Sequence, residues 1–256
     1  MNFVKGLSLP VFLLLIWIIV AKFSLISFYI IPPPEQVLAT TMVLLEKGTL
    51  FTHLSTSFYR VVAGFSLAFL FAFPLAVLLG MNRRFAPYIN PPFEFVRHIP
   101  PLACIPMLIL WFGIGEAPKL AVIIMAAFFP VFLNTLNGIS QCDAKLLEVG
   151  DAFALNSYDK FRRIILPASL PSIIVGMRLG LGYSWRALIG AELVAASAGI
   201  GYMILDAEQI SRSDIVIVGI LTIGAIGYSI DYLFLKIAQY SMPWAKRTAD
   251  DGSFNP

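Results

Sequence analysis

Long apolar runs are the feature of this sequence that most constrains its fold. Several stretches approach the ~20 apolar residues that a helix needs to cross a hydrocarbon core about 30 Å thick. We place six of them, at residues 7–30, 61–81, 102–114, 120–136, 173–196 and 215–235. Because a bilayer offers no water to the backbone, each run must be helical. The sequence therefore predicts an all-α, polytopic membrane protein with about six transmembrane helices.

The composition agrees with a single membrane domain. Hydrophobic residues make up 59% of the 256 residues and charged residues 13%, whereas a soluble domain carries roughly a quarter charged residues. Six crossings would use about half of the chain, so we expect one domain over residues 1–256 with its core at about 52–240. The first run follows Lys5 like a signal peptide, but no clear A-x-A site comes after it, and we expect an uncleaved span.

The chain has few residues suited to catalysis or metal binding. Cys104 and Cys142 lie in or beside different apolar runs, and His53 and His98 are the two histidines. This pattern predicts neither a disulfide nor a metal site. The sequence has no phosphate-binding loop of the G-x4-G-K-[ST] type, and neither histidine lies deep in a span beside a serine or carboxylate. We therefore expect no enzyme activity, no catalytic residues and no cofactor in this chain.

Basic residues predict the orientation in the membrane. If the N-terminus is cytoplasmic, eleven Lys and Arg residues fall inside and five outside, with Arg178 and Arg186 in a span. The inside set is Lys5, Arg83, Arg84, Arg97, Lys145, Lys160, Arg162, Arg163, Lys236, Lys246 and Arg247, and the outside set is Lys22, Lys47, Arg60, Lys119 and Arg212. By the positive-inside rule we expect both termini in the cytoplasm of a bacterial cell, in its inner membrane. The net charge of +3 then reflects topology, and we expect no nucleic-acid partner.

Prolines and small residues shape the runs. Three consecutive prolines from Pro32 end the first run, and residues 35–47 resemble a short surface helix. Pro106 and Pro130 predict kinks inside later runs. The second run carries small residues at an unbroken spacing of four, which lets another helix approach closely; packing within the chain is their simplest use. These residues are Gly64, Ala68, Ala72, Ala76 and Gly80.

A polar segment at residues 148–171 interrupts the apolar runs and predicts a cytoplasmic helical hairpin. Asp143 is placed to cap a helix over residues 144–153, in which apolar residues recur at helical spacing. Asn156 and Ser157 supply a turn, with Ser157 expected to cap a second helix that Pro167 stops. Two short amphipathic helices joined in this way form a compact surface that can dock into a groove on another protein.

This segment resembles the EAA loop, E-A-A-x3-G-x9-I-x-L-P, of the membrane subunits of binding-protein-dependent ABC importers. Glu148, Phe161, Ile164, Leu166 and Pro167 fall at its spacing. Val149 and Gly150 replace the two alanines, and Ala154 replaces the glycine, which leads us to expect that Asn156 and Ser157 take over the turn.

The resemblance implies that residues 143–167 form a coupling loop whose helices fit a cleft on an ATPase subunit. The implied ATPase-coupling residues are Glu148, Val149, Gly150, Ala154, Leu155, Asn156, Ser157, Phe161 and Pro167. Glu148 would be a polar anchor at the docking surface. The alternative for Glu148 is a solvated helix cap or a local salt bridge with Lys145 or Arg163.

Further motifs in the expected order extend the resemblance over most of the chain, to the branch that carries nitrate, alkanesulfonate and taurine. They lie at residues 97–103, 105–106, 110–116, 129–130, 134–135, 191–193 and 199–202. The resemblance implies a type I ABC importer with two permease copies, as a homodimer, surrounded by membrane lipid. Two ABC ATPase subunits would hold ATP and Mg²⁺, and a periplasmic or lipoprotein solute-binding protein would deliver a small solute.

Charged residues in the fifth run are candidates for the translocation path, because ionised groups inside a membrane usually face a cavity or a partner. The candidates are Trp185, Arg186 and Glu192. Arg186 could bind an anion through its guanidinium, with Trp185 packed on an apolar tail. The alternative is a structural pair of Arg186 with Glu192 or Asp231. Arg178 lies near enough to the membrane surface to snorkel.

Other functions stay open from the residues alone. An ion-coupled secondary transporter would need coupling carboxylates near the midplane and a repeat relating its halves, and we find no clear repeat. A purely structural membrane scaffold fits the composition as well. An ABC permease for a vitamin precursor or another uncharged molecule would carry the same motifs.

Overall fold

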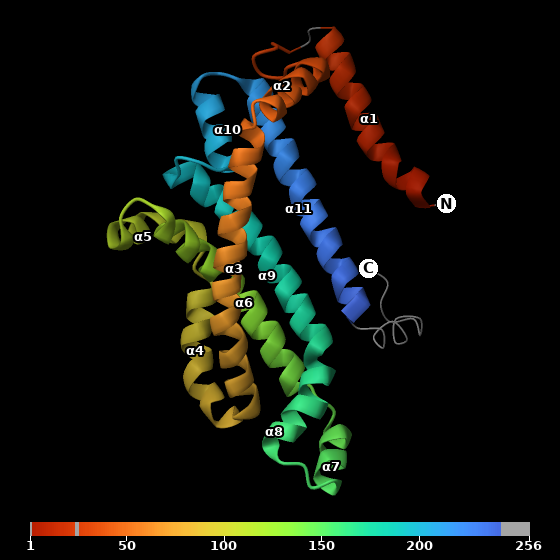
Figure 1. The fold of residues 1–256 in the computed structure, drawn as a ribbon, viewed down its shortest axis with the longest axis vertical. Coiled ribbons are helices and arrows are strands. Elements are labelled where there is room, and N and C mark those ends of the chain that lie inside the picture. Colours follow the sequence, from red (N-terminus) through yellow and green to blue (C-terminus); the bar gives the residue numbers. More distant parts are fainter. Residues whose placement is uncertain (1, 24–25, 242–256) are drawn as a thin grey trace. The chain divides into compact units, whose positions relative to one another are not determined.

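The computed structural model describes residues 2–23 and 26–241, and all regular elements in these ranges are helical (Figure 1). The α-helices are α1 (Asn2–Lys22), α2 (Pro34–Glu46), α3 (Thr49–Met81), α4 (Ala86–Arg97), α5 (Ile105–Phe112), α6 (Glu116–Ser140), α7 (Ala144–Ala152), α8 (Ser157–Lys160), α9 (Leu166–Ala195), α10 (Ile200–Gln209) and α11 (Ser213–Ser241). The predicted all-α class is confirmed. Two basic residues of the expected inside set, Lys246 and Arg247, lie outside the described residues.

The described residues form two compact units. The first comprises the residues up to Phe58 together with Glu192–Ile226, and the second comprises Tyr59–Ala191 together with the residues from Gly227 onward. The boundaries fall inside α3, α9 and α11, so each of these helices contributes residues to both units.

The expected count of six crossings is not confirmed. Within residues 2–23 and 26–241, four helices are long and apolar enough to span a membrane: Thr49–Met81, Glu116–Ser140, Ser157–Val194 and Ser213–Tyr240. The pair Pro87–Arg97 and Pro101–Phe112, bent by 82°, would be a fifth if it is one span. Ser8–Lys22 is a shorter apolar helix. The first helix ends at Lys22 instead of continuing to residue 30, and residues 27–30 form a turn, in which Ile30 N–H donates to the Ser27 carbonyl at 2.9 Å.

In the second unit, α6 packs closely against α3 through the predicted stripe of small residues. Ala68, Ala72 and Ala76 are fully buried. A Cβ on Gly64 would lie 2.6 Å from Ile123 Cγ2 of α6, and one on Gly80 would lie 2.7 Å from the corresponding atom of Ile139. The close approach and its simplest use, packing within the chain, are therefore confirmed.

The α9 helix approaches α6 by the same device. A Cβ on Gly176 would lie 2.9 Å from the Pro130 carbonyl oxygen, and one on Gly180 would lie 3.2 Å from the Ala127 carbonyl oxygen. Pro130 stays inside a continuous α6, and Asn134 Nδ2 donates to its carbonyl at 2.8 Å. These contacts hold α9, the helix that carries Arg186, close against α6.

The expectation that Pro167 stops a helix is wrong. A π-helical segment, Phe161–Ile165, joins α8 to α9, and Pro167 is the second residue of α9. Proline has no amide hydrogen to donate, and the wider π-helical turn that precedes Pro167 leaves room for its ring, so the helix continues. The predicted fifth run therefore begins seven residues earlier than expected, at Leu166 instead of residue 173.

In the first unit, α2 confirms the short helix expected at residues 35–47. Asp214, at the start of α11, is buried and accepts a hydrogen bond from Thr40 Oγ1 of α2 at 2.6 Å. Arg212 donates to both oxygens of Asp214 at 2.8 and 2.6 Å. This bidentate contact raises the pKa of Arg212, which keeps the guanidinium charged. The pair therefore ties α2 to the first turn of α11.

Candidate functional site

The 143–167 hairpin is built from α7, α8 and the π-helical segment, which Figure 1 shows in green beyond the ends of α6 and α9. Asp143 caps α7 by accepting from Lys145 N–H at 2.9 Å, as predicted. Asn156, not Ser157, caps α8, since it accepts from Asp159 N–H at 2.8 Å while Ser157 is already helical. Both residues are good N-caps, and the helix simply begins one residue earlier than expected.

The turn of the hairpin lies at Ala154. This residue has φ +52°, a left-handed conformation that costs an alanine free energy and favours glycine. Ala154 N–H donates to the Asp151 carbonyl at 2.9 Å, and Leu155 N–H donates to the Gly150 carbonyl at 3.0 Å. The expectation that Asn156 and Ser157 take over the turn is therefore wrong.

Gly150 holds the two arms of the hairpin together. It is buried, and a Cβ there would lie 2.8 Å from Ile164 Cδ1 and 3.3 Å from Lys160 Cγ. Lys160 also forms an ion pair with Asp151. The residue that replaces the second alanine of the loop thus permits the close contact between the arms.

The hairpin exposes large apolar side chains beside polar and charged ones. Phe153 is 76% exposed and Tyr158 68%, and Leu155 and Phe161 are half-buried. The other predicted coupling residues are exposed, except Gly150; they are Glu148, Val149, Ala154, Asn156, Ser157 and Pro167.

Burial raises the pKa of the neighbouring Cys142 thiol, which stays protonated.

Glu148 has no ion pair within the described residues. Arg163 instead contacts Asp159, at 3.5 Å. The local salt bridge considered for Glu148 is therefore not present, and its carboxylate is available at the surface.

A cavity of about 920 Å³ lies within the second unit. It is lined by residues of α4, α6 and α9 and by residues 98–102, which connect α4 to α5. Its lining residues are Phe93, Val96, Arg97, His98, Ile99, Pro100, Pro101, Leu102, Ile124, Met125, Ala126, Phe128, Phe129, Pro130, Leu133, Leu179, Tyr183, Arg186 and Ala187. None of these residues is acidic. We call this space the Arg186 cavity.

Arg186 has no carboxylate partner among the described residues. Its Nε donates to the Gly182 carbonyl at 3.1 Å, and its guanidinium carbon lies 4.7 Å from the centre of the Tyr183 ring. Asp231, considered as its partner, instead accepts from Arg178 at 2.6 and 2.7 Å. The structural pair with Asp231 is therefore absent.

The other two predicted path residues lie elsewhere. Trp185 is 4% exposed and does not line the cavity; its Nε1 would be 3.2 Å from a Cβ on Gly227. Glu192 belongs to the first unit and is fully buried. The structure thus does not bring Trp185 into contact with the space that Arg186 lines.

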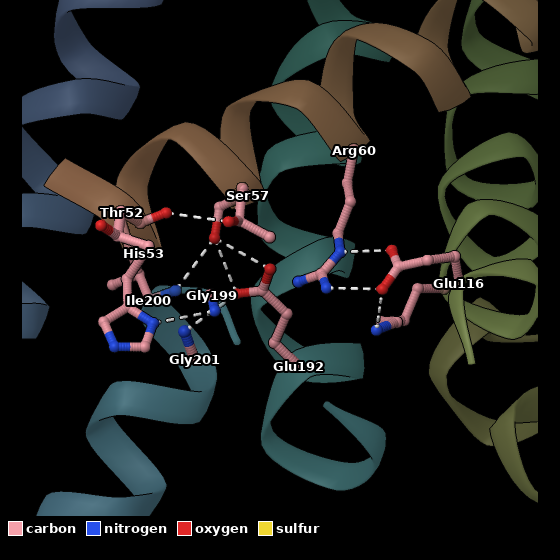
Figure 2. Close-up of polar contacts among 11 residues, drawn as sticks. Thr52, His53, Ser57, Arg60, Glu116, Glu192, Gly199, Ile200 and Gly201 are labelled. Atoms are coloured by element: carbon pink, nitrogen blue, oxygen red, sulfur yellow. Dashed lines mark hydrogen bonds and ion pairs between the residues drawn. The ribbon is translucent and has the colours of Figure 1, made fainter. Parts of the chain in front are cut away.

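Glu192 and two residues of α3 form what we call the α10 cap (Figure 2). Ser57 Oγ donates to the Glu192 carboxylate, at 2.8 Å from one oxygen, and accepts from Ile200 N–H at 2.9 Å. Gly201 N–H donates to Glu192 at 2.9 Å, and Gly199 N–H donates to His53 Nδ1 at 3.1 Å. The first amides of a helix lack partners within the helix, and side chains supply them here.

Gly199 is required by this arrangement. It has φ +122°, and a Cβ there would collide with the Glu192 carboxylate. The glycine therefore allows the buried carboxylate to reach the N-terminus of α10, where the helix dipole favours a negative charge.

A second polar group in Figure 2 belongs to the second unit. Arg60 and Lys119 are both buried, and both contact Glu116. Arg60 donates at 2.6 and 2.7 Å, and Lys119 Nζ lies 2.7 Å from the carboxylate. Two of the five basic residues expected outside are thus buried in ion pairs instead of standing in loops.

Two features of these sites were missed from the sequence. His53 and Ser57 lie before the expected start of the second run at residue 61, although their spacing of four places them on one helical face. Residues 97–102 of the motif at 97–103 line the same cavity as Arg186, but nothing in either stretch alone indicates that the two face one space.

Comparison with known proteins agrees with this architecture. The model of the family "Binding-protein-dependent transport system inner membrane component" matches residues 64–239. The chain is similar to the "Putative aliphatic sulfonates transport permease protein SsuC" of Bacillus subtilis, 37% identical over 95% of this chain and 88% of the relative. It is also similar to the "Taurine transport system permease protein TauC" of Escherichia coli, 32% identical over 91% of this chain and 86% of that one.

A solved structure shares the fold. A chain of the MetNI methionine ABC transporter, in an inward facing conformation, aligns with a TM-score of 0.61 and 17% identity, covering 78% of this chain and 97% of that one. The family model covers well over half of the chain, and both relatives exceed 30% identity over most of it. The chain therefore belongs to the binding-protein-dependent transport system inner membrane components and is a multi-pass permease subunit of an ABC importer.

Proposed function

We propose that residues 143–167 couple this permease to the ATPase subunits of its transporter. The observation that carries the proposal is the hairpin's exposed surface, which presents Val149, Phe153 and Tyr158 together with the carboxylate of Glu148, for which no ion pair is found within the described residues. Exposed aromatic side chains such as Phe153 and Tyr158 are the kind that protein–protein interfaces are enriched in. The close packing of the two arms at Gly150 favours movement of the hairpin as one body.

The remaining assembly follows from this role. Residues 1–256 form one permease domain with its core at about 52–240, and both termini lie in the cytoplasm. Two copies of the chain, two ATPase subunits holding ATP and Mg²⁺, and an external solute-binding protein complete the importer. The chain itself needs no cofactor. ATP-driven closure of the ATPase pair shifts the permease between inward-open and outward-open states, because ATP binds one state more tightly.

The coupling proposal can be tested with Glu148→Ala in the complete transporter reconstituted in proteoliposomes. We expect ATP-driven uptake to fall at least about tenfold, since a charge-assisted contact is worth roughly 1.5–3 kcal/mol, and less ATPase to copurify. Glu208→Ala, which removes an exposed carboxylate from α10, is the matched control. Wild-type uptake and copurification with Glu148→Ala would refute the anchor role.

We further infer that the solute is a small organic anion, such as an alkanesulfonate, with taurine and nitrate as the alternatives. Arg186 supports this inference, because its guanidinium lines a cavity without acidic residues and can fork onto a sulfonate or carboxylate. The path roles of Trp185 and Glu192 stay predictions. Their burial supports structural roles instead.

A further inference from the structure

The walls of the Arg186 cavity are apolar over most of their extent. Met125, Phe129 and Leu133 come from α6, and Leu179 comes from α9. The cationic side chains are Arg186 and Arg97, and Arg97 already pairs with Glu94 at 2.6 Å. The cavity therefore offers one unpaired cation beside an extended apolar wall.

The size of the cavity exceeds what a small inorganic anion needs. Clefts and cavities of roughly 300–1,000 Å³ bind drug-sized molecules, and this cavity, which is open on one side, measures about 920 Å³. Nitrate could contact Arg186 but would leave the apolar walls uncovered. An organic body of several carbons would cover them and gain free energy from the burial.

The charge of the cavity disfavours a zwitterion. No acidic side chain lines it, so an ammonium group on the solute would find no carboxylate among the lining residues and would lie near the guanidinium of Arg186. Like charges in a partly desolvated site repel each other. Taurine should therefore bind less well than an alkanesulfonate of the same size.

We propose that the Arg186 cavity is a specificity site within the permease for organic monoanions with an extended or aromatic apolar body, typified by longer alkanesulfonates. The sulfonate contacts Arg186, which the Tyr183 ring holds in place, and the apolar body packs on Met125, Phe129 and Leu179. This inference rests on the proposed import of an organic anion and adds that selection occurs in the membrane subunit itself.

The test measures binding of a chain-length series to the assembled permease–ATPase complex in phosphatidylcholine nanodiscs. Methane-, propane- and hexanesulfonate are titrated by calorimetry, with protein-free discs as blanks for partitioning into lipid. We expect affinity to rise up to about fourfold per buried methylene. Propanesulfonate should bind at least about tenfold more tightly than taurine, its near-isostere with an ammonium in place of a methyl group. No dependence on chain length, or equal binding of taurine, would overturn the proposal.

Two variants test the apolar part and the cationic part of the site separately. Leu179→Trp should fill the cavity and flatten the dependence on chain length, whereas Arg186→Met should weaken methane- and hexanesulfonate by the same factor, about tenfold or more. Val175→Trp is the matched control, because Val175 lies one turn earlier on α9, is similarly exposed (45% against 42% for Leu179) and does not line the cavity. A control that flattens the dependence as much as Leu179→Trp would contradict the assignment.

Two more outcomes are distinguished by the same preparations. An anionic lipid, like an alkanesulfonate, has an anionic head and an apolar tail, so nanodiscs that include phosphatidylglycerol test whether lipid occupies the cavity. Complete loss of hexanesulfonate binding in these discs would assign the cavity to lipid and overturn the proposal. ATP-driven uptake of sulfonates in proteoliposomes tests the proposed function separately. Uptake without selection for chain length defeats only this inference, whereas absence of any ATP-driven anion uptake defeats the proposed function.

Discussion

Two charged residues of α9, Glu192 and Arg186, show opposite ways of carrying a charge in a membrane-length helix. Glu192 is fully buried and accepts hydrogen bonds from Ser57 and from the N-terminus of α10. Arg186 is exposed in a cavity and contacts only a carbonyl and an aromatic ring among the interactions described. The number of partners, not the presence of charge, separates a structural residue from a candidate binding residue.

The difference has an energetic basis. A buried carboxylate is tolerated only where donors replace water, and the α10 cap supplies hydroxyl and amide donors. A guanidinium without a carboxylate partner lacks that compensation, and it contributes less to folding than a paired one would. Such an unpaired charge is the kind of group that a ligand anion can complete.

Glu192→Ala should have the largest effect on the molecule. The change leaves the Ser57 hydroxyl and the Gly201 amide without their acceptor, at about 1–3 kcal/mol for each buried group. We expect a large fall in melting temperature in detergent, or failure to accumulate in the membrane. Glu208→Ala on α10 is the control. A melting temperature equal to wild type would show that the α10 cap is not structural.

Arg186→Met should have the opposite effect, with a large loss of transport and little loss of stability. We expect ATP-driven sulfonate uptake to fall roughly ten- to hundredfold, the equivalent of a charge-assisted hydrogen bond of about 1.5–3 kcal/mol, with little change in melting temperature. Arg186→Lys, which keeps the charge but loses the fork, should retain intermediate uptake. Comparable losses of stability in the Arg186 and Glu192 variants would remove the distinction between the two residues.

The sequence predicts the helices better than their contacts. Apolar runs and the spacing of Gly64 through Gly80 depend on local composition, so the all-α class and the close α3–α6 approach follow from them. The extension of α3 back to Thr49 does not follow, because residues 49–60 include His53, Ser57 and Arg60, polar side chains that bind partners on other helices or at the start of α10. His53 and Ser57 were missed for this reason.

The hairpin shows where a motif is informative and where it is not. The position of Asp143 as a cap is local information and was predicted correctly. The turn at Ala154 was not, since alanine rarely adopts positive φ, and the sequence alone does not show the backbone hydrogen bonds and the close contact of Gly150 with Ile164 that accompany it. The partner of Arg186 could not be predicted either, because α9 offers Asp231 two arginines, and helix packing decides that Arg178 binds it.

The Arg178–Asp231 ion pair gives a further comparison with the unpaired Arg186, and its removal should have the smallest effect of the changes considered. Both side chains are partly exposed, and the arginine donates to both carboxylate oxygens. Replacing both partners with apolar residues, as in Arg178→Met with Asp231→Leu, removes the charges together and should change stability by no more than about 1 kcal/mol. Sulfonate uptake should stay within about twofold of wild type.

The single variant Arg178→Met supplies the control, because it leaves the Asp231 carboxylate unpaired in an apolar helix and should lower the melting temperature more than the double variant does. Melting curves of the two proteins in the same detergent, with uptake in proteoliposomes, give both readouts. If the double variant lost uptake while remaining folded, the paired arginine would have a role in transport, and pairing would no longer distinguish Arg178 from Arg186. If the double variant behaves like wild type, the Arg178–Asp231 ion pair is dispensable for transport. Arg186, which has no carboxylate partner, then remains the candidate of the two arginines for binding the anionic solute.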